Sequence, residues 1–428
     1  MVWALLAVVV GWTVWHALPR SATEHARVAP MQATADATAV ARGAYLARLG
    51  NCALCHTARG GVTYAGGRAI DTPFGAVFSS NITPDRQHGI GAWSPDDFWR
   101  ALHWGESRDG HWLTPAFPYT SFTHITRGDA DALYVYLMSL PPSSRANTPH
   151  SLSWPYNTQA ALGVWRTLFF TPGNADGNMA ATQPAASPEL LRGAYLVQGL
   201  GHCSACHTER NALGAIDASR ALAGGMIPAQ NWYAPSLRDT GQASVASWSE
   251  AEIVTLLQTG SSPRGNALGP MAEVVLHSTQ YLSDADARAM VHYLKSLPAV
   301  ALHEAAPLVQ TATAGTMVSL GASLYDRHCA ECHGKQGQGI AKAYPALAGN
   351  HTVTAQHINN LVQMVWRGGF APATAANPRP FGMPPFQQVL NDKELAAVLT
   401  YVRTSWGNQA GPVSEFDINQ LHRLQVHF

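Results

Sequence analysis

The chain has 428 residues, which is enough for about three domains of ordinary size. Its 27 basic residues balance 27 acidic ones, and charged residues make up only 13% of the chain. This balance excludes the strongly basic surface that nucleic-acid binding requires, so we expect no nucleic-acid partner.

The chain begins with an apolar stretch. Residues 2–18 are apolar apart from Thr13 and His16, and a membrane-spanning helix needs about 17–25 such residues. A cleaved secretory signal is the alternative interpretation. No Lys or Arg precedes the apolar run, which favours a retained transmembrane anchor over residues 1–20. Either interpretation carries the rest of the chain across a membrane, behind a small, polar tether at residues 21–39.

The pattern Cys-x-x-Cys-His occurs three times, at residues 52–56, 203–207 and 329–333, and uses all six cysteines. Two thiols at this spacing can add to the two vinyl groups of one haem, and the histidine that follows then reaches the iron. A zinc site would need four ligands, and a thioredoxin-like pair needs no histidine after it. The sequence therefore predicts three covalently bound haem c groups. The predicted attachment residues are Cys52, Cys55, Cys203, Cys206, Cys329 and Cys332, and the predicted proximal iron ligands are His56, His207 and His333.

The residues around each motif predict three units of similar order. The first, at 40–145, has a middle helix that starts at Ser94-Pro95 and ends near Gly105, and a closing helix at about 129–140. A linker at 146–185 leads to the second unit, at 186–300, with helices over 249–259 and 283–297. A linker at 301–315 leads to the third unit, at 316–408, with helices over 358–366 and 392–405. A tail at 409–428 has no predicted haem role.

Each unit thus reads as helix, motif, Gly- and Pro-rich loops, middle helix, loop and closing helix. This order resembles the class I cytochrome c fold. We therefore expect an all-α protein made of three tandem cytochrome c domains with long loops, behind an N-terminal membrane-anchor helix.

A class I cytochrome c places a methionine opposite the proximal histidine, on the loop between the middle and closing helices. A thioether there favours ferrous iron and raises the reduction potential. The third unit has Gly382-Met383-Pro384 at this place, and the second has Gly269-Pro270-Met271. We expect Met271 and Met383 to be the sixth ligands of the second and third irons.

The first unit breaks this pattern, because Phe117 occupies the place of the methionine and cannot bind iron. The iron is then either five-coordinate or bound by a residue from elsewhere. His103 lies two residues before Gly105, as Gln258 lies two residues before Gly260, on a helix expected at the distal side. We hypothesise that His103 is the sixth ligand, which would lower the potential of this haem. The other candidates are His111, His124 and Met138.

Several phrases of the chain resemble the three-haem cytochrome c subunits of membrane-bound periplasmic dehydrogenases. These phrases lie at residues 42–46, 72–75, 81–85, 115–119 and 232–235, and the resemblance extends over about residues 40–408. It implies a subunit at the periplasmic face of the bacterial inner membrane. That subunit takes electrons from a catalytic dehydrogenase subunit and passes them to ubiquinone.

The catalytic partner implied by the resemblance is of one of three kinds. It is a quinoprotein alcohol dehydrogenase, a flavoprotein sugar or gluconate dehydrogenase, or a molybdopterin aldehyde dehydrogenase with a small iron–sulfur subunit. Members that serve the alcohol and sugar enzymes usually carry Met in the Pro-Ala-x-Pro-Tyr loop. Phe117 together with His103 is similar to the aldehyde dehydrogenase branch, so we expect that partner, with the alcohol and sugar enzymes as the alternative.

Two further functions remain open. An open first haem could make the chain a haem enzyme of the peroxidase type, or the chain could be a membrane-tethered carrier with no fixed partner. The sequence contains no nucleophile triad, phosphate-binding loop or pyranopterin motif, so we expect no catalytic residue.

Overall fold

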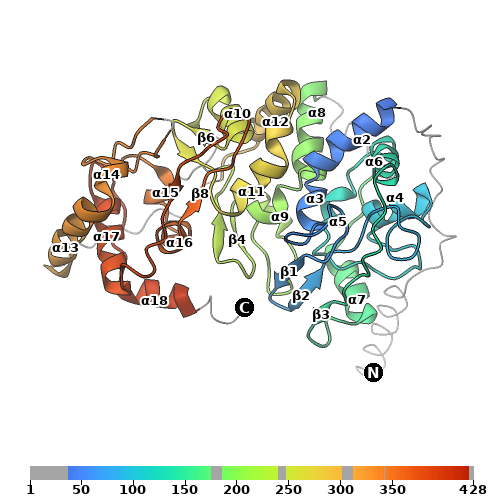
Figure 1. Cartoon of the computed structure of the whole chain (residues 1–428), viewed down its shortest axis with the longest axis horizontal. Helices are drawn as coiled ribbons and strands as arrows, with labels where there is room; N and C mark the ends of the chain where they lie inside the picture. Colours follow the sequence, from blue (N-terminus) through green and yellow to red (C-terminus); the bar gives the residue numbers. More distant parts are fainter. Residues whose placement is uncertain (1–36, 175–185, 240–246, 301–311, 342, 424–428) are drawn as a thin grey trace, which may run out of the picture. The chain divides into compact units, whose positions relative to one another are not determined.

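A computed structural model describes residues 37–174, 186–239, 247–300, 312–341 and 343–423 (Figure 1). The predicted anchor at 1–20 lies outside these ranges, as does nearly all of the predicted tether. Within them, no helix combines the length and the apolar character needed to cross a membrane. The chain separates into two compact units: unit 1 comprises residues 1–205 and 210–216, and unit 2 comprises residues 206–209 and 217–428.

Unit 1 contains the first motif and the helix that leads to the second. Its helices are α2 (Ala37–Leu49), α3 (Cys52–Cys55), α4 (Pro95–Trp104), α5 (Tyr119–Phe122), α6 (Arg127–Met138), α7 (Gln159–Phe169), α8 (Pro188–Ala194) and the π-helix η2 (Tyr195–Leu200). Its strands β1 (Ala69–Thr72), β2 (Gly75–Phe78) and β3 (Ser151–Leu152) form one antiparallel sheet in that order, with Ile70 opposite Val77 and Gly75 opposite Leu152.

Unit 2 has the same kind of parts in two further sets. The first set is α9 (Ser204–His207, which begins in unit 1), the 3-10 helix η3 (Ala218–Arg220), β4 (Gly225–Ile227), β5 (Trp232–Ala234), α10 (Glu250–Thr259), β6 (Ser261–Ser262), β7 (Gly265–Asn266), α11 (Pro270–His277), the 3-10 helix η5 (Thr279–Tyr281) and α12 (Asp284–Ser296). The second set is α13 (Ala312–His328), α14 (Ala330–His333), α15 (His351–Thr354), α16 (Asn359–Arg367), β8 (Gly369–Phe370), β9 (Gly382–Met383), α17 (Asp392–Thr404) and α18 (Glu415–Arg423).

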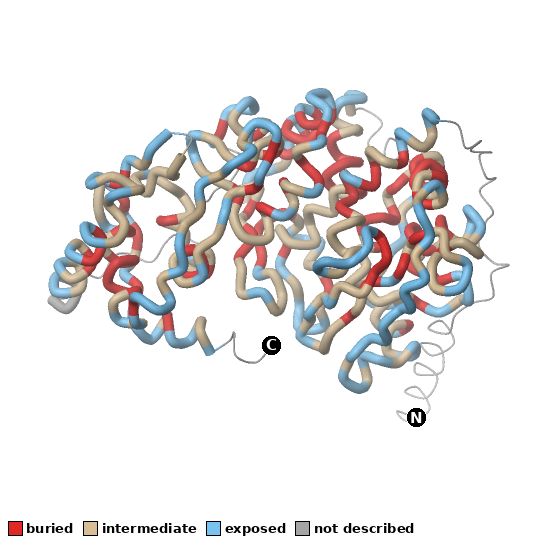
Figure 2. Tube along the Cα trace, viewed as in Figure 1, coloured by how far each residue is buried: buried red, intermediate tan, exposed pale blue. Residues whose placement is uncertain are grey.

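Opening and closing helices cross at a glycine. A Cβ on Gly43 of α2 would overlap the carbonyl oxygen of Ala132 on α6, and a Cβ on Gly321 of α13 would overlap that of Ala397 on α17. Only glycine therefore allows these backbones to come so close. Buried residues run along α6 and α17 (Figure 2), so each crossing lies at the core of its domain.

The structure contains the middle helices predicted for the first two units, and residues at both ends of each helix cap it. Ser94 caps α4 through a reciprocal pair of hydrogen bonds with Asp97, and Ser249 caps α10 in the same way with Glu252. The left-handed residues Gly105 and Gly260 end these two helices. The two helices therefore have the same kinds of cap at both ends, in agreement with the pairing of Gly105 and Gly260 made from the sequence.

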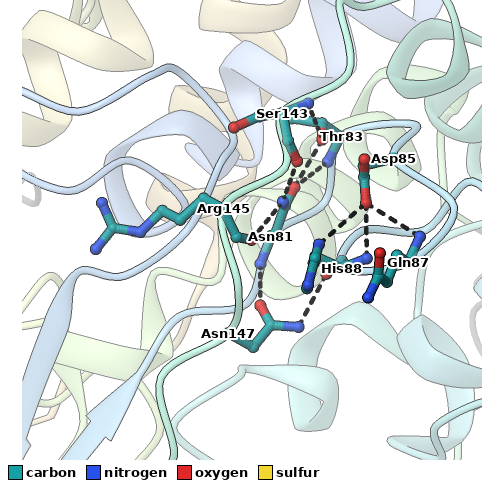
Figure 3. Close-up of polar contacts among 8 residues, drawn as sticks. All are labelled: Asn81, Thr83, Asp85, Gln87, His88, Ser143, Arg145 and Asn147. Atoms are coloured by element: carbon teal, nitrogen blue, oxygen red, sulfur yellow. Dashed lines mark hydrogen bonds and ion pairs between the residues drawn. The ribbon is translucent and has the colours of Figure 1, made fainter.

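The segment that follows α6 is held to the rest of unit 1 by hydrogen bonds. The side-chain amide of Asn81 donates to the carbonyl oxygens of Ser143 (2.8 Å) and Arg145 (3.0 Å), and its backbone N–H donates to Asn147 Oδ1 (2.7 Å; Figure 3). The same segment supplies β3 to the sheet. Helix α7 was not predicted, and it places Arg166 over the ring of Trp112. The prediction of a linker at residues 146–185 is thus incomplete, because the segment has secondary structure of its own.

One other expectation needs correction. The fold is largely helical, but the described residues also form one three-stranded and three two-stranded sheets, so it is not purely α. The tail, for which the sequence predicted no haem role, packs on the third domain: α18 packs on α17 and Ile418 is completely buried. Thr400 Oγ1 both donates to the carbonyl oxygen of Val413 (3.1 Å) and accepts from its N–H (3.0 Å).

Candidate haem sites

Each of the three motif histidines is held through the same ring nitrogen. The Nδ1–H groups of His56, His207 and His333 donate to the backbone carbonyl oxygens of Ser80 (2.7 Å), Pro235 (2.7 Å) and Pro345 (3.0 Å). This bond fixes the tautomer and the ring orientation and leaves Nε2 available to a metal. The arrangement is that of metal-ligating histidines, and it recurs although the acceptor lies 24, 28 and 12 residues downstream.

Burial keeps these imidazoles in the form that binds iron. Desolvation lowers the pKa of His56, His207 and His333, while the hydrogen bond to the carbonyl opposes it. The rings are therefore neutral at physiological pH, as ligation requires.

Burial raises the pKa of the first cysteine in the first and third motifs. Desolvation and the neighbouring Cys55 raise the pKa of the Cys52 thiol to about 12, and burial with Cys332 raises the pKa of Cys329 to about 11. Reactive Cys-x-x-Cys thiols have lowered pKa values instead. None of the six cysteines, all of which lie in described ranges, forms a disulfide.

Two arginines brace the first two motifs, and sequence reasoning missed both. Arg68 donates to the carbonyl oxygen of Leu54 (3.1 Å), and Arg210 donates to that of Ala205 (2.8 Å). Both acceptors are the residue just before the second cysteine of their motif. The arginines lie at different distances from their motifs along the chain, so spacing gives no signal for the shared role.

The two predicted methionine ligands lie in different local structures. Met383 belongs to β9, where it lies opposite Gly369 of β8. Met271 is the second residue of α11 and lies two residues after Gly269, whose φ is 54°. The indole of Trp232 packs on Gly269, where a Cβ would lie 2.6 Å from the ring. Both methionines are half-buried, and their role as ligands stays a prediction.

His103 has a different environment. Protein atoms cover it completely, and its ring stacks on Trp99 (4.5 Å between centroids, 23°) and meets Trp104 edge-on (4.9 Å). The matching residue Gln258 donates to the carbonyl oxygen of Leu282 (3.2 Å), just before α12. The hypothesis that His103 binds iron stays a prediction, with this packing as the competing role.

The other candidates for the first iron are placed as follows. His111 is exposed and pairs with Asp109. His124 is half-buried, and desolvation lowers its pKa. Met138 ends α6 and is half-buried, and Phe117 lies edge-on to Phe122 (5.5 Å).

Within each compact unit, the neighbourhoods of successive motifs come into contact. In unit 1, His202 Nε2 lies 3.4 Å from the carbonyl oxygen of Gly50, two residues before Cys52. Tyr195 of η2 donates to Asp129 of α6 (2.5 Å). In unit 2, the ring of His357 stacks on Tyr233 (3.9 Å, 26°).

The residues present fit haem c: paired thiols followed by a neutral imidazole whose Nδ1 is bonded to a carbonyl. Together with the crossing helices, these features define a c-type cytochrome. Comparison with known proteins agrees, because the cytochrome c family model matches residues 191–298 and 318–406.

Three relatives extend the match over most of the chain. The cytochrome c subunit of alcohol dehydrogenase (quinone) from Gluconacetobacter polyoxogenes is 40% identical, over 90% of this chain and 85% of its own. The gluconate 2-dehydrogenase cytochrome c subunit from Pantoea cypripedii is 38% identical, over 91% of each chain. The fructose dehydrogenase cytochrome subunit from Gluconobacter japonicus is 35% identical, over 92% of this chain and 84% of its own. This chain belongs to the family of cytochrome c subunits of such dehydrogenases.

The family resemblance seen in the sequence is thereby confirmed. The expectation of an aldehyde dehydrogenase partner is not, because these relatives are named for alcohol, gluconate and fructose enzymes. They favour the alternative that the sequence left open. Phe117 alone therefore does not identify the branch.

Proposed function

We propose that this chain is the three-haem electron-transfer subunit of a periplasmic dehydrogenase complex, and that it delivers electrons to ubiquinone in the membrane. The repeated hydrogen bond from the motif histidine to a backbone carbonyl carries the proposal, because metal-ligating histidines are typically oriented by such a bond. Membership in a family of dehydrogenase cytochrome subunits supports the choice of donor.

The haem iron, when bound, supplies one-electron chemistry. The residues of this chain hold and tune it. The six thiols of the motifs would attach the porphyrins, and neutral His56, His207 and His333 would ligate the irons. Thioether ligation by Met271 and Met383 would raise two of the three potentials, while the first site would differ because Phe117 replaces the methionine.

We infer that the catalytic partner is of the alcohol, gluconate or fructose dehydrogenase type. The three relatives described above support this partner. The molybdopterin enzyme with its small iron–sulfur subunit was expected from Phe117 and His103. The N-terminal segment 1–20 would hold the complex at the periplasmic face of the inner membrane.

Purification of the native complex in mild detergent tests the proposal. We expect a dehydrogenase subunit with pyrroloquinoline quinone or flavin to co-purify, and its substrate to reduce a soluble ubiquinone analogue. Molybdenum with acid-labile sulfide in the complex would instead establish the aldehyde-oxidising partner. A chain that purifies alone and reduces no quinone with any added dehydrogenase would contradict the proposal.

A control variant separates the cytochrome from the catalytic subunit. Cys332→Ser should leave the dehydrogenase active with an artificial dye but lower quinone reduction strongly, because the third haem loses one attachment bond. Equal loss of both activities would indicate a damaged complex and would count against an electron-transfer role for this chain.

A further inference from the structure

Strand β5 reaches both sides of the predicted second haem site. At its carboxyl end, the carbonyl oxygen of Pro235 accepts the Nδ1–H of His207 at 2.7 Å. At its amino end, the indole of Trp232 packs on Gly269, two residues before Met271. A displacement of β5 therefore acts on the proximal ligand and on the loop of the predicted sixth ligand together.

The third cytochrome domain holds this strand in place. The side chain of Asn360, on α16, accepts the N–H of Tyr233 at 2.8 Å and donates to its carbonyl oxygen at 2.7 Å. These two bonds satisfy both backbone groups of Tyr233, as a neighbouring strand would. One residue along the helix, Asn359 donates to Asn231 Oδ1 at 2.7 Å.

An aromatic contact reinforces these bonds. His357 stacks on Tyr233 with 3.9 Å between ring centroids and 26° between planes. Tyr233 is only 7% exposed, so the stack covers its ring and holds β5 from a second direction. The phenol side of Tyr233 is also confined, because a Cβ on Gly224 would lie 2.5 Å from its hydroxyl oxygen.

We propose that Asn360 and His357 of the third domain are positioning residues that set the reduction potential of the haem held by His207 and Met271. The hydrogen bond to Pro235 makes the His207 imidazole more basic, and a more basic ligand stabilises ferric iron. Release of β5 would lengthen this bond and raise the potential. The inference rests on the proposed haem-binding function, and it adds that one cytochrome domain tunes the haem of its neighbour.

Asn360→Ala tests the inference on the full-length chain with its haems attached. We expect faster hydrogen exchange at the Tyr233 amide and a more positive potential for one haem, with the other two unchanged. Met271→His identifies which potential belongs to the second haem, because histidine in place of methionine lowers it. His357→Ala, at an exposed position, should shift the same potential in the same direction by a smaller amount.

Thr374→Ala is the matched control. Thr374 Oγ1 lies 3.4 Å from the carbonyl oxygen of Thr259, another hydrogen bond between the same two domains, but it does not touch β5. This variant should leave all three potentials in place. A shift as large as that of Asn360→Ala would mean general loosening of the interface and would overturn the inference.

Two other results distinguish a wrong positioning role from a wrong haem-binding function. Faster exchange at Tyr233 with an unchanged second potential would overturn the positioning role while leaving the haem assignment intact. Fewer than three haems per chain in the unmodified protein would instead refute the proposed function on which the inference rests.

Discussion

At the scale of single residues, the chemistry depends on which atom of each ligand is left available. The sequence identifies His56, His207 and His333 from their motifs, but it does not reveal the carbonyls that orient them. Those acceptors are backbone oxygens, so no side-chain type marks them. Pro235 was visible only as part of a family phrase, and its role became clear from the 2.7 Å bond to His207.

Met383→His tests the predicted ligand of the third iron. Exchange of a thioether for an imidazole lowers the potential of a haem, so we expect one of the three potentials to fall. Met364→Leu is the control, because Met364 is 8% exposed and serves as core packing on the same domain. Three unchanged potentials in Met383→His would remove Met383 from the ligand set.

His103→Phe distinguishes ligation from packing in the first domain. Phenylalanine keeps a flat ring against Trp99 but offers no nitrogen to iron. If His103 is a ligand, the first haem should become high-spin and bind carbon monoxide. Electron paramagnetic resonance and carbon monoxide difference spectra measure this, and an unchanged low-spin signal would assign His103 to packing.

At the scale of helices and strands, the sequence predicts best where the local signal is complete. Two of the three middle helices, α4 and α10, carry caps at both ends and begin and end where those caps place them. Helix α7 and strand β3 were missed, because they lie in a Pro- and Asn-rich segment and gain their order from contacts with distant residues such as Asn81. Propensity does not reveal such tertiary stabilisation.

The crossing of α13 and α17 can be tested within one helix. Gly321→Ala forces a methyl group against the carbonyl oxygen of Ala397, and overpacking of this kind costs about 1–3 kcal/mol. Gly315→Ala is the control, since nothing lies within 4 Å of its Cβ position, and alanine there should stabilise α13 by up to about 1 kcal/mol. Thermal unfolding compares the two, and equal effects would show that the crossing does not need Gly321.

The capping box of α10 predicts a pH dependence. The backbone N–H and hydroxyl of Ser249 hold the pKa of Glu252 below its usual value of 4.5. A carboxylate whose pKa is lower in the folded state stabilises the protein at pH values above its unfolded-state pKa. This stabilisation is lost as the pH falls through the folded-state pKa. Glu252→Gln should therefore lower the melting temperature at pH 7, and the difference should shrink below about pH 4. A difference that stays constant down to pH 3 would exclude this contribution.

At the scale of the whole molecule, the threefold repeat of the Cys-x-x-Cys-His motif indicates the domain organisation. Three motifs at matching places predicted three haem-binding domains, whereas the contacts that join successive motifs were invisible in sequence. The bonds from Asn360 to Tyr233 and from His202 to Gly50 link residues 127 and 152 positions apart. They depend on how the domains pack, which no local pattern encodes.

The tail illustrates the same limit. Its sequence has no haem motif, yet Ile418 lies fully buried in the core beside α17, and Trp366 stacks against His422 of α18 (4.1 Å). The amphipathic spacing of α18 is the sequence feature that indicates this packing, but the helix is short and the pattern is correspondingly weak. A tail that packs in this way belongs to the third domain.

We propose that one chain carries three haems that each exchange one electron. An anaerobic reductive titration of the purified 45.8 kDa chain, followed by haem absorbance, tests it most directly. We predict an uptake of three electrons per chain, with one potential separated from the other two because the first site lacks methionine. An uptake of fewer than three electrons would contradict the account.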